Sequence, residues 1–479
     1  MTGWRLRSSG ILGGWGMSAD WPSMKISNVA VYRNNKRIPL KSLDRAKRQG
    51  IYPYYGASGV VDYIDDYIFD GTYLLISEDG ENLRSRKTPV AFKAHGKFWV
   101  NNHAHILEEK EEGILDYLEY YFSQLDLTPY ITGAVQPKLN KANLDTIEIP
   151  IPPLEERRAI NGTLNSLTYK IDLNHQINQT LEQMAQAIFK SWFVDFEPVK
   201  AKIAALEAGG SEEDALLAAM QAISGKGEAE LTRLQAEQPE QYAELRATAE
   251  LFPSAMQDSE LGEIPEGWEV TDLKSSTIEI RRGISPKYTE EGGIQVINQK
   301  CIRNHKVDFS LARRNDTSKR KIDGREIQIG DVLVNSTGVG TLGRLAPVRH
   351  LPEPSVADSH VTVIRANNRL ISNAFLAGLM ITSEPLIEAS GAGSTGQTEL
   401  RKQVLEEIVF ARPSLKLSRA YEGAVEPMGQ QMACIERQLV SLASTRDVIL
   451  PKLLSGDLSV PNKGNQPKAE PLSPLQGVE

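Results

Sequence analysis

Hydrophobic residues recur at alternating steps of four and three along two long stretches of the chain. In a helix this spacing brings them onto one stripe, the heptad seam of a coiled coil. The seams run over residues 160–188 and 421–449, about 43 Å of helix each. Their members are Ile160, Leu164, Leu167, Ile171, Asn174, Asn178, Leu181, Ala185 and Ile188, and then Tyr421, Val425, Met428, Met432, Ile435, Leu439, Leu442, Arg446 and Ile449. We therefore predict two long helices, over residues 154–199 and 414–455.

Two polar residues, Asn174 and Asn178, interrupt the first seam. One interpretation is a polar layer that the helix tolerates. The other is control of register, a well-attested use of a buried Asn in a coiled coil. The sequence leaves both interpretations open.

The seams belong to an internal repeat with a constant offset of 261 residues. QPKLNKANLDTIEIPIPPL, from Gln136, matches QTELRKQVLEEIVFARPSL, from Gln397, so that Leu139 falls on Leu400. The same offset superposes the two seams. An unbroken offset with matching residue classes indicates two copies of one structural unit.

Upstream of these runs the match is looser and its register changes slightly. Asn102–Leu107 resembles Ser359–Ile364, and Tyr73–Ser77 resembles Val332–Ser336. The scaffold strands of the unit are therefore repeated, whereas the rest of each globular region differs strongly.

The chain thus reads as globular region, long helix, globular region, long helix. Glycine-punctuated runs such as YIFDGTYLLI and IGDVLVNS predict strands in both globular regions, which open at Trp21 and Trp268. The predicted fold class is α+β, with two α/β domains joined by two long antiparallel coiled-coil helices in a pseudo-two-fold arrangement. The predicted segments are a leader (1–20, with Met17 as an alternative start), a first domain (21–153), a first helix (154–199), an acidic helix-prone linker (200–262), a second domain (263–413), a second helix (414–455) and a disordered tail (456–479).

The excess negative charge of the chain is concentrated in one segment. The 479 residues include 54 Lys and Arg against 62 Asp and Glu, a net charge of −8. Residues 200–262 hold twelve acidic and five basic residues, a net of −7, so the remainder is close to neutral. The overall acidity therefore does not argue against a nucleic-acid partner.

The two cysteines, Cys301 and Cys434, exclude a disulfide framework and a cysteine-based zinc cluster, and they fit a reducing cytosol. No apolar run approaches the roughly 18 residues of a membrane span. The first twenty residues lack the apolar core of a signal peptide. We expect a cytoplasmic protein with no membrane partner.

Two equal heptad helices in one chain pack most economically against each other. A globular region precedes each helix, so antiparallel packing would place the two regions at opposite ends. Successive turns of a DNA groove are about 34–36 Å apart, which suits a two-fold reader with helices of this length. Different surfaces on a repeated frame would then read different half-sites.

Several long phrases are more specific still. They are YPYYGASGVVDYIDDYIFDGTYLLISEDG (52–80), SWFVDFEPVKAK (191–202), SELGEIPEGWEV (259–270), GISPKY (283–288) and STRDVILPKLLSGDLSV (444–460). In this order they resemble the specificity subunits of type I restriction–modification systems, and the resemblance covers residues 21–460. Residues 200–262 depart from it, because this segment is long for a minimal family member.

The resemblance implies two target-recognition domains that each bind one half of a bipartite site in double-stranded DNA. It also implies two modification (adenine methyltransferase) subunits docked on the helices, and association with restriction/translocase subunits. S-adenosylmethionine, ATP and Mg²⁺ are expected on those partners, and no cofactor is expected on this chain.

The candidate DNA contacts are clusters of basic side chains, one of them beside two amides. Lys and Arg suit phosphates, whereas Arg, Asn and Gln suit base edges in the major groove. The candidates are Lys36, Arg37, Lys47, Arg48, Arg84, Arg86 and Lys87 in the first domain, and Arg281, Arg282, Lys287, Asn298, Gln299, Lys300, Arg313, Arg314, Lys319, Arg320 and Lys321 in the second. For each of them the alternative is an ordinary solvated surface position. Tyr54, Tyr55 and Trp99 are core or DNA-facing, with core favoured for Trp99.

Motifs that would make the chain an enzyme are incomplete. The Gly-rich run 391–398 imitates a phosphate-binding loop, but Gln397 stands where the loop requires Lys, so a structural turn is favoured. His103 and His105 share a face of a predicted strand without a third ligand, so satisfied polar residues are favoured over a metal site. No Asn/Asp-Pro-Pro-aromatic run of an adenine methyltransferase is present.

We therefore predict a non-catalytic subunit with no catalytic residues and no metal. Two alternatives are a fused, stand-alone restriction/methylation enzyme and a coiled-coil DNA scaffold without sequence preference.

Overall fold

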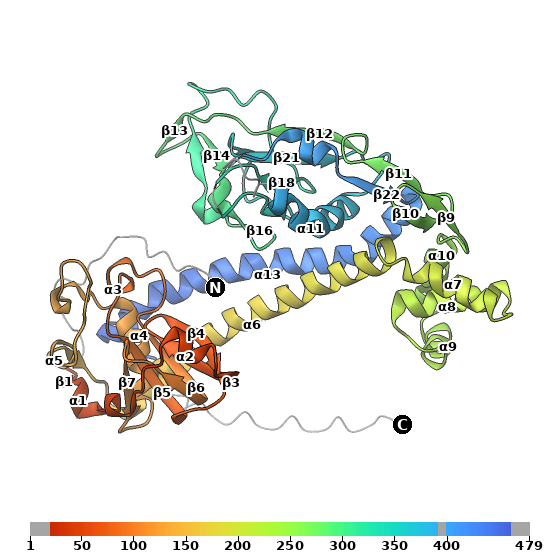
Figure 1. The fold of residues 1–479 in the computed structure, drawn as a ribbon. Coiled ribbons are helices and arrows are strands. Elements are labelled where there is room, and N and C mark those ends of the chain that lie inside the picture. Colours follow the sequence, from red (N-terminus) through yellow and green to blue (C-terminus); the bar gives the residue numbers. More distant parts are fainter. Residues whose placement is uncertain (1–19, 339, 391–398, 461–479) are drawn as a thin grey trace, which may run out of the picture. The chain divides into compact units, whose positions relative to one another are not determined.

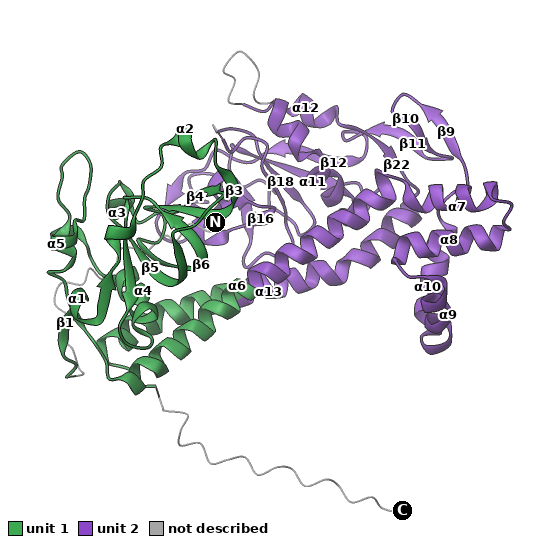
Figure 2. Cartoon of the chain, turned by 60° about the horizontal axis from the view of Figure 1, so that its bottom comes forward, with its two compact units in different colours: residues 1–173, 439–479 green, residues 174–438 purple. Residues whose placement is uncertain are grey.

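A computed structural model describes residues 20–338, 340–390 and 399–460. The chain divides into two compact units, which Figure 2 colours separately. Unit 1 comprises the chain up to residue 173 together with the chain from residue 439 onward, and unit 2 comprises residues 174–438. Most of the predicted leader and tail, and the Gly-rich run 391–398, lie outside the described residues.

The globular part of unit 1, residues 21–153, is called arm 1. It is built on one six-stranded sheet with the order β2-β7-β5-β6-β3-β4 (Figure 1). Neighbouring strands are antiparallel except β3 and β6, which are parallel. The strands are β2 (Ala30–Tyr32), β3 (Gln49–Gly56), β4 (Gly59–Ile64), β5 (Phe69–Ser77), β6 (Ala91–Val100) and β7 (Ala104–Glu109).

Both faces of the sheet are buried at β5, which explains the uninterrupted apolar run from Tyr73 to Ile76. Leu74 and Ile76 pack with helix α4 (Ile114–Gln124), whereas Tyr73 and Leu75 face an aromatic cluster on the other side. Successive strand residues point to opposite faces, so a strand covered twice is apolar at every position. Arm 1 also contains β1 (Ser23–Lys25), which pairs with β8 (Glu148–Pro150), and the short helices α1 (Ile26–Val29), α2 (Ser42–Arg45), α3 (Asn82–Ser85) and α5 (Lys141–Leu144).

The globular part of unit 2, residues 263–413, is called arm 2. It contains two four-stranded sheets, with the orders β12-β21-β18-β19 and β13-β17-β14-β20. The strands are β12 (Thr277–Arg282), β13 (Tyr288–Thr289), β14 (Ile294–Ile297), β17 (Arg313–Asn315), β18 (Val332–Asn335), β19 (Leu345–Pro347), β20 (Ser355–Ala357) and β21 (Val361–Ala366). The remaining elements are β11 (Glu269–Asp272), which pairs with β22 (Val409–Arg412), the hairpin β15 (Ile302–Arg303) and β16 (Lys306–Val307), and helices α11 (Asn373–Ser390) and α12 (Lys402–Glu406).

The two arms have the same topology. Strands β2, β7, β5 and the first part of β6 correspond to β12, β21, β18 and β19, and every pair is antiparallel. The parallel pair of β3 with the end of β6 corresponds to the parallel pair of β14 with β20. The one long strand of arm 1 is therefore divided in arm 2, which splits its sheet in two. The mixed α+β class with two domains and two long helices is confirmed.

The backbone hydrogen bonds correct one detail of the predicted repeat. Glu78 N–H donates to the His103 carbonyl at 2.8 Å, and Ser336 N–H donates to the His360 carbonyl at 2.8 Å. His103 and His360 are thus equivalent, as the sequence predicts, and Glu78 is equivalent to Ser336. The expected match of Tyr73–Ser77 with Val332–Ser336 is wrong by one residue.

The correct partner of Ser77 is Asn335, because each lies opposite the first residue of the neighbouring strand, Ala104 or Val361. A slip of one residue reverses which side chains face each side of a sheet. Here both faces are buried, so the apolar pattern carries no alternation that would reveal the slip.

The long helices are α6 (Leu154–Phe193) and α13 (Leu415–Ser455), side by side in Figure 1. Within unit 1, Leu164 of α6 shares a core with Leu450 of α13. Within unit 2, the Tyr421 hydroxyl of α13 donates to the Ala185 carbonyl of α6 at 3.2 Å. Residue numbers rise along one helix as they fall along the other, so the pair is antiparallel. Every predicted seam residue is buried or half-buried.

The first helix ends at Phe193, six residues earlier than predicted. Phe196 adopts a left-handed backbone conformation with φ of 55°, and Pro198 lies in the first turn of α7 (Glu197–Glu207). Proline lacks an N–H group, and the first turn of a helix accommodates it readily because that N–H would have no partner within the helix. The family phrase SWFVDFEPVKAK therefore contains a helix break.

Asn174 and Asn178 are both buried within the seam. The Asn174 amide reaches the Gln438 side chain at 3.5 Å, whereas the Asn178 amide has no partner among the described residues. The polar layer and the control of register both stay predictions.

The end of each long helix completes the core of the arm that precedes the other helix. Phe193, at the end of α6, packs against Phe375 and Trp268 of arm 2, with ring centroids 4.9 and 5.9 Å apart. Leu450 and Leu453, at the end of α13, belong to the core of arm 1. These two ends are related by the repeat offset of 261.

The segment predicted as a linker folds into a helical insert, residues 197–250. Its helices are α7, α8 (Glu212–Ser224), α9 (Glu228–Glu237) and α10 (Pro239–Glu250), followed by the hairpin β9 (Met256–Ser259) and β10 (Gly262–Pro265). Leu216, Met220 and Leu231 form a core of its own. A capping box at Ser211 starts α8, and Gly225 ends it in the left-handed conformation. The acidic side chains cover a packed helical structure.

Among the described residues, no helix combines the length and apolar character needed to cross a membrane.

The end of α13 packs in the core of arm 1, and this contact predicts how a substitution in α13 affects stability. Leu453 is fully buried in arm 1, so Leu453→Ala should lower the free energy of unfolding by about 2–5 kcal/mol. The loss should weaken hydrogen-exchange protection in the sheet of arm 1, although Leu453 follows arm 2 in the chain. Val448→Ala, at an exposed position of the same helix, is the control and should change little. Equal effects of the two substitutions would contradict the prediction.

Candidate functional site

The second sheet of arm 2 holds several of the predicted basic residues at one edge. β17 carries Arg313, whose guanidinium lies 3.4 Å from the centre of the Tyr288 ring. Lys287 immediately precedes β13, and its carbonyl accepts a hydrogen bond from the backbone N–H of Asp316 at 2.8 Å. A guanidinium stacked on an aromatic ring keeps its charge exposed in a fixed plane. This edge therefore presents ordered positive charge.

Several predicted lysines are exposed and form no ion pair with the described residues. They are Lys36, Lys47 and Lys87 in arm 1 and Lys287, Lys300 and Lys321 in arm 2. Lys319, by contrast, pairs with Asp316 at 3.0 Å. Unpaired surface lysines are the side chains best suited to phosphate contacts, because no internal carboxylate has to be displaced.

Most of the predicted arginines are engaged within the chain. Arg314 forms a two-pronged contact with Glu353 at 2.9 and 2.8 Å. Arg86 donates to the Phe122 carbonyl at 2.8 Å, near the end of α4. The other engaged arginines are Arg37, Arg48, Arg84, Arg281 and Arg282. Arg320 is half-buried. These contacts give each engaged arginine a structural function, and their DNA contacts stay predictions.

The two predicted amides also have partners inside arm 2. Asn298 is buried; its side chain accepts from the Lys300 backbone at 2.9 Å and donates to the Leu311 carbonyl at 3.1 Å. Gln299 accepts from the Thr337 hydroxyl at 3.2 Å. Base reading by either amide stays a prediction.

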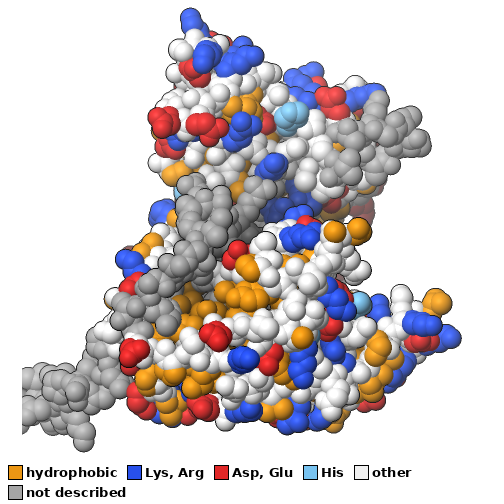
Figure 3. Space-filling model, turned by 90° about the vertical axis from the view of Figure 1, so that its left-hand side faces the viewer, with side chains coloured by type: hydrophobic (Ala, Val, Ile, Leu, Met, Phe, Trp, Pro, Cys, Tyr) orange, Lys and Arg blue, Asp and Glu red, His pale blue; other side chains and the backbone are white. Residues whose placement is uncertain are grey.

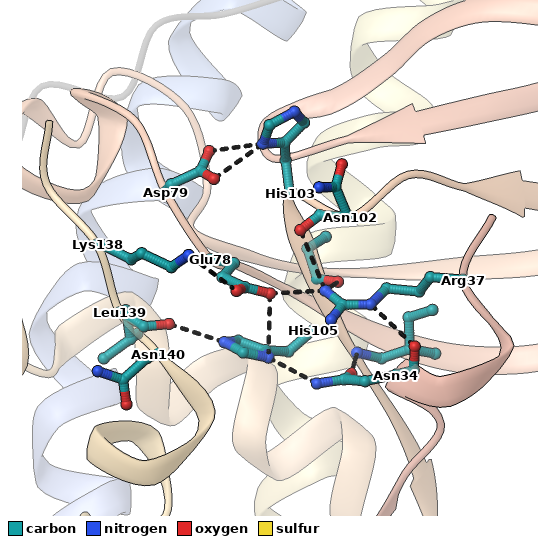
Figure 4. A network of polar contacts seen from close by, with 12 residues as sticks. Asn34, Arg37, Glu78, Asp79, Asn102, His103, His105, Lys138, Leu139 and Asn140 are labelled. Carbon is teal, nitrogen blue, oxygen red and sulfur yellow. Dashed lines mark hydrogen bonds and ion pairs between the residues drawn. The ribbon is translucent and has the colours of Figure 1, made fainter. Parts of the chain in front are cut away.

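Figure 4 shows a polar network in arm 1 that the sequence indicated only in part. Arg37 donates to Glu78 at 2.6 Å and to the Ala104 carbonyl at 2.9 Å, and Lys138 lies 3.6 Å from Glu78. Burial alone would raise the pKa of Glu78, but the Arg37 hydrogen bond and the nearby positive charges outweigh it and lower that pKa. The network ties β5, β7 and the loop before α5 together.

His105 lies at the centre of this network. Burial lowers the pKa of its imidazole, which favours the neutral ring. Its Nε2 lies 2.7 Å from the Leu139 carbonyl, and its Nδ1 lies 2.9 Å from the Asn34 amide nitrogen. A carbonyl only accepts, so we assign the proton to Nε2. His103 instead contacts Asp79 through Nδ1 at 2.8 Å.

The equivalent positions of arm 2 have different chemistry. Ser336 replaces Glu78, and its hydroxyl lies 2.6 Å from the hydroxyl of Thr362, the counterpart of His105. Thr337 replaces Asp79 and contacts His360 Nδ1 at 2.9 Å. The frame of hydrogen bonds is repeated while the charges are not.

Exposed apolar side chains near β3 and β4 escaped the sequence analysis. Ile51, Val61 and Tyr63 are each more than half exposed, and Lys47 is exposed nearby in the chain. The face drawn in Figure 3 likewise shows hydrophobic side chains interspersed with Lys and Arg. The alternation in GVVDYI could have indicated a half-exposed strand, but it did not show which half would be uncovered. Tyr54 and Trp99, in contrast, are core residues.

Across the described ranges, no group of three His, Cys, Asp or Glu side chains is arranged to hold a metal ion. Cys301 is buried and Cys434 is exposed, both as free thiols.

Residues 18–183 match the family model described as type I restriction modification DNA specificity domain. A relative from Haemophilus influenzae, named type I restriction enzyme HindI specificity subunit, is 31% identical over 338 residues, which are 67% of this chain and 71% of the relative. The MjaIX specificity subunit of Methanocaldococcus jannaschii is 23% identical over 404 residues, 81% of this chain and 79% of that one.

The fold is also similar to a solved structure. The S subunit of a type I restriction–modification system from M. genitalium has a TM-score of 0.54 with 14% identity, covering 95% of this chain and 99% of that chain. At this identity the likeness concerns the fold.

The geometry of Glu78 predicts an effect of pH on arm 1. Glu78→Gln removes a charged acceptor from Arg37, so the free energy of unfolding at pH 7 should fall by about 1–3 kcal/mol. The lowered pKa of Glu78 stabilises the folded state above the ordinary glutamate value of 4.5, and this contribution is lost as the pH falls through the folded pKa.

The measurement is urea unfolding of Glu78→Gln and of the unsubstituted protein at pH 7 and at pH 4. The difference in stability between the two proteins should be smaller at pH 4. Glu109→Gln, at an exposed position of β7, is the matched control. A loss of the same size at both pH values would contradict this account.

Proposed function

Because the chain belongs to the family of type I restriction–modification specificity subunits, we propose that it reads a two-part DNA target, one half with each arm. It is a non-catalytic member of its complex. The observation that carries the proposal is a repeated frame with different exposed side chains. Ile51, Val61 and Tyr63 are exposed beside β3 and β4 of arm 1, whereas arm 2 exposes the Arg313–Tyr288 stack on its second sheet. Two arms of equal topology and unequal surface suit two different half-sites.

The surface charges support contact with the DNA backbone. The unpaired lysines of both arms are exposed, and the Arg313–Tyr288 stack adds ordered charge in arm 2. Phosphate contacts position a protein on DNA, and contacts with base edges specify the sequence. The exposed apolar residues near β4 suit contact with thymine methyl groups in arm 1.

We further propose that two modification (methyltransferase) subunits dock on the long helices and that restriction/translocase subunits join them. S-adenosylmethionine, ATP and Mg²⁺ then belong to those partners. The outward faces of α6 and α13 support this docking, because exposed apolar residues such as Tyr169 and Val440 lie opposite the seam.

An exchange of arms tests the division of the target. Replacing residues 268–412 with the corresponding arm of a relative should change one half of the sequence methylated by the complex and leave the other half intact. The measurement is methylome mapping of a host that carries the exchanged subunit with its modification subunits. A change in both halves would show that the arms do not read independently. Methylation without any sequence preference would favour the scaffold alternative.

The unpaired lysines predict the salt dependence of binding. In the complex, the triple substitution of Lys287, Lys300 and Lys321 by Gln should flatten the plot of log affinity against log salt by up to about 2.7, since each lost phosphate contact removes about 0.9 from the slope. Lys226→Gln, in the helical insert, is the matched control and should leave the slope unchanged. An unaltered slope in the triple variant would place these lysines away from the DNA.

A further inference from the structure

Arm 2 contacts the long helices at a second place, apart from its hydrophobic core. The tip of the β15–β16 hairpin is a two-residue turn, Asn304 and His305, with φ of 51° and 54°. Positive φ at both residues is the geometry of a type I′ turn, whose twist matches the flanking strands. This tight turn directs His305 toward α6.

An ion cluster joins this turn to α6. Arg349 pairs with Glu182 of α6 and also donates to the His305 carbonyl at 2.8 Å. His305 Nε2 lies 2.6 Å from Glu384 of α11, and its Nδ1 lies 3.6 Å from Glu182. Gln186, one turn along α6, donates to Glu182 at 3.1 Å.

The neighbouring residue makes a similar contact with the other long helix. His350 Nδ1 lies 3.3 Å from Glu436 of α13. The side chains of Glu182, Arg349, Glu436 and His350 are all mostly buried. Two consecutive residues of arm 2 therefore contact both helices: Arg349 binds a carboxylate of α6, and His350 binds a carboxylate of α13.

These contacts differ from core packing in being directional. Buried charges are tolerated only in good pairing geometry, and removing one partner leaves the other uncompensated. Burial would raise the pKa of Glu182, but its hydrogen bonds and the Arg349 charge bring it to about 2. Burial would lower the pKa of His305, but the hydrogen bonds and charges of Glu182 and Glu384 raise it to about 9.

The cluster lies at a distance from the hydrophobic attachment. Glu182 precedes Phe189, the first α6 residue that is fully buried in that core, by seven residues, about 10 Å along α6. The hydrophobic effect that drives apolar packing is non-directional. A second, directional contact about 10 Å away resists rocking of arm 2 about the first.

We propose that this ionic latch, formed by Glu182, His305, Arg349 and Glu384 with the pair His350–Glu436, fixes the orientation of arm 2 on the helices and thereby sets the spacer length accepted between the two halves of the DNA target. The inference rests on the proposed function. Base pairs are about 3.4 Å apart along the duplex, so a displacement of a few ångströms at the DNA-facing edge changes the accepted spacer by one pair. The latch residues act as positioning residues and need not touch DNA.

The test is a charge-neutral double variant, Glu182→Gln with Arg349→Gln, in the full chain bound to its modification subunits. The readout is methylation of a DNA library in which only the spacer length varies. The variant should keep both half-sites. Its discrimination between the preferred spacer and spacers one base pair longer or shorter should fall at least about fivefold, because fivefold is the low end of ordinary coupling between two sites. The control is Glu213→Gln with Arg246→Gln, which removes an exposed ion pair of the helical insert.

His305→Gln gives a second, milder test with a pH readout. Several groups face His305 and its neighbours in the cluster. They are Glu182 and Gln186 on α6, Glu384 on α11, Glu436 on α13, and Lys306, Arg349 and His350 in arm 2. A raised pKa means that the His305 contribution is complete below its ordinary value of 6.5 and is lost as the pH rises through about 9. Spacer discrimination by the unsubstituted protein should fall over that range, whereas His305→Gln should be low and insensitive to pH.

An unchanged spacer profile in a variant that still methylates both half-sites overturns the latch while the proposed function stands. If the double variant does not fold, a flat pH profile of the unsubstituted protein overturns it instead. If the unsubstituted complex shows no two-part target at all, the proposed function fails first.

Discussion

Each arm of this protein depends on a helix end that reaches it from the other half of the sequence. Trp192 and Phe193 close the core of arm 2, and Leu450, Leu453 and Leu454 close the core of arm 1. The contact is tight, because a Cβ on Gly378 would lie 2.3 Å from the Phe189 ring. An arm without its distant helix end would expose a large apolar surface to water, at roughly 25 cal/mol per Å². The helices are therefore part of both cores as well as connections between domains.

This exchange explains why the repeat is strict in some places and loose in others. The helices, the strand frame and the run before each helix build cores and seams, where volume and periodicity constrain every residue. The loops and strand edges outside the frame contribute little to either core. They are free to differ. Side chains differ even on the repeated frame, because Glu78 of arm 1 has Ser336 as its counterpart in arm 2 on the same backbone hydrogen bonds. A protein that reads two different half-sites needs a constant frame and variable surfaces of this kind.

The helical insert has a separate consequence for charge. Its acidic residues dominate the net charge of the chain, yet they surround a core of their own in α8, α9 and α10. The arms are left nearly neutral overall, with lysines that no internal carboxylate occupies. The distribution of charge, and not its sum, is what fits this chain to a DNA partner.

The sequence by itself determined the two seams, the repeat, the α+β class and the family, because each of these is written in periodicity or in long local phrases. It also favoured the core for Trp99, whereas only the structure decided that Tyr54 is a core residue as well. Only the tertiary structure decided which cations are free, because Arg314 meets Glu353 and Arg349 meets Glu182 across separations that no local pattern encodes. It also decided the one-residue register at Ser77, because a strand buried on both faces has no alternation to read. Local periodicity follows from backbone geometry, whereas the pairing of charges distant in sequence follows from how the whole chain folds.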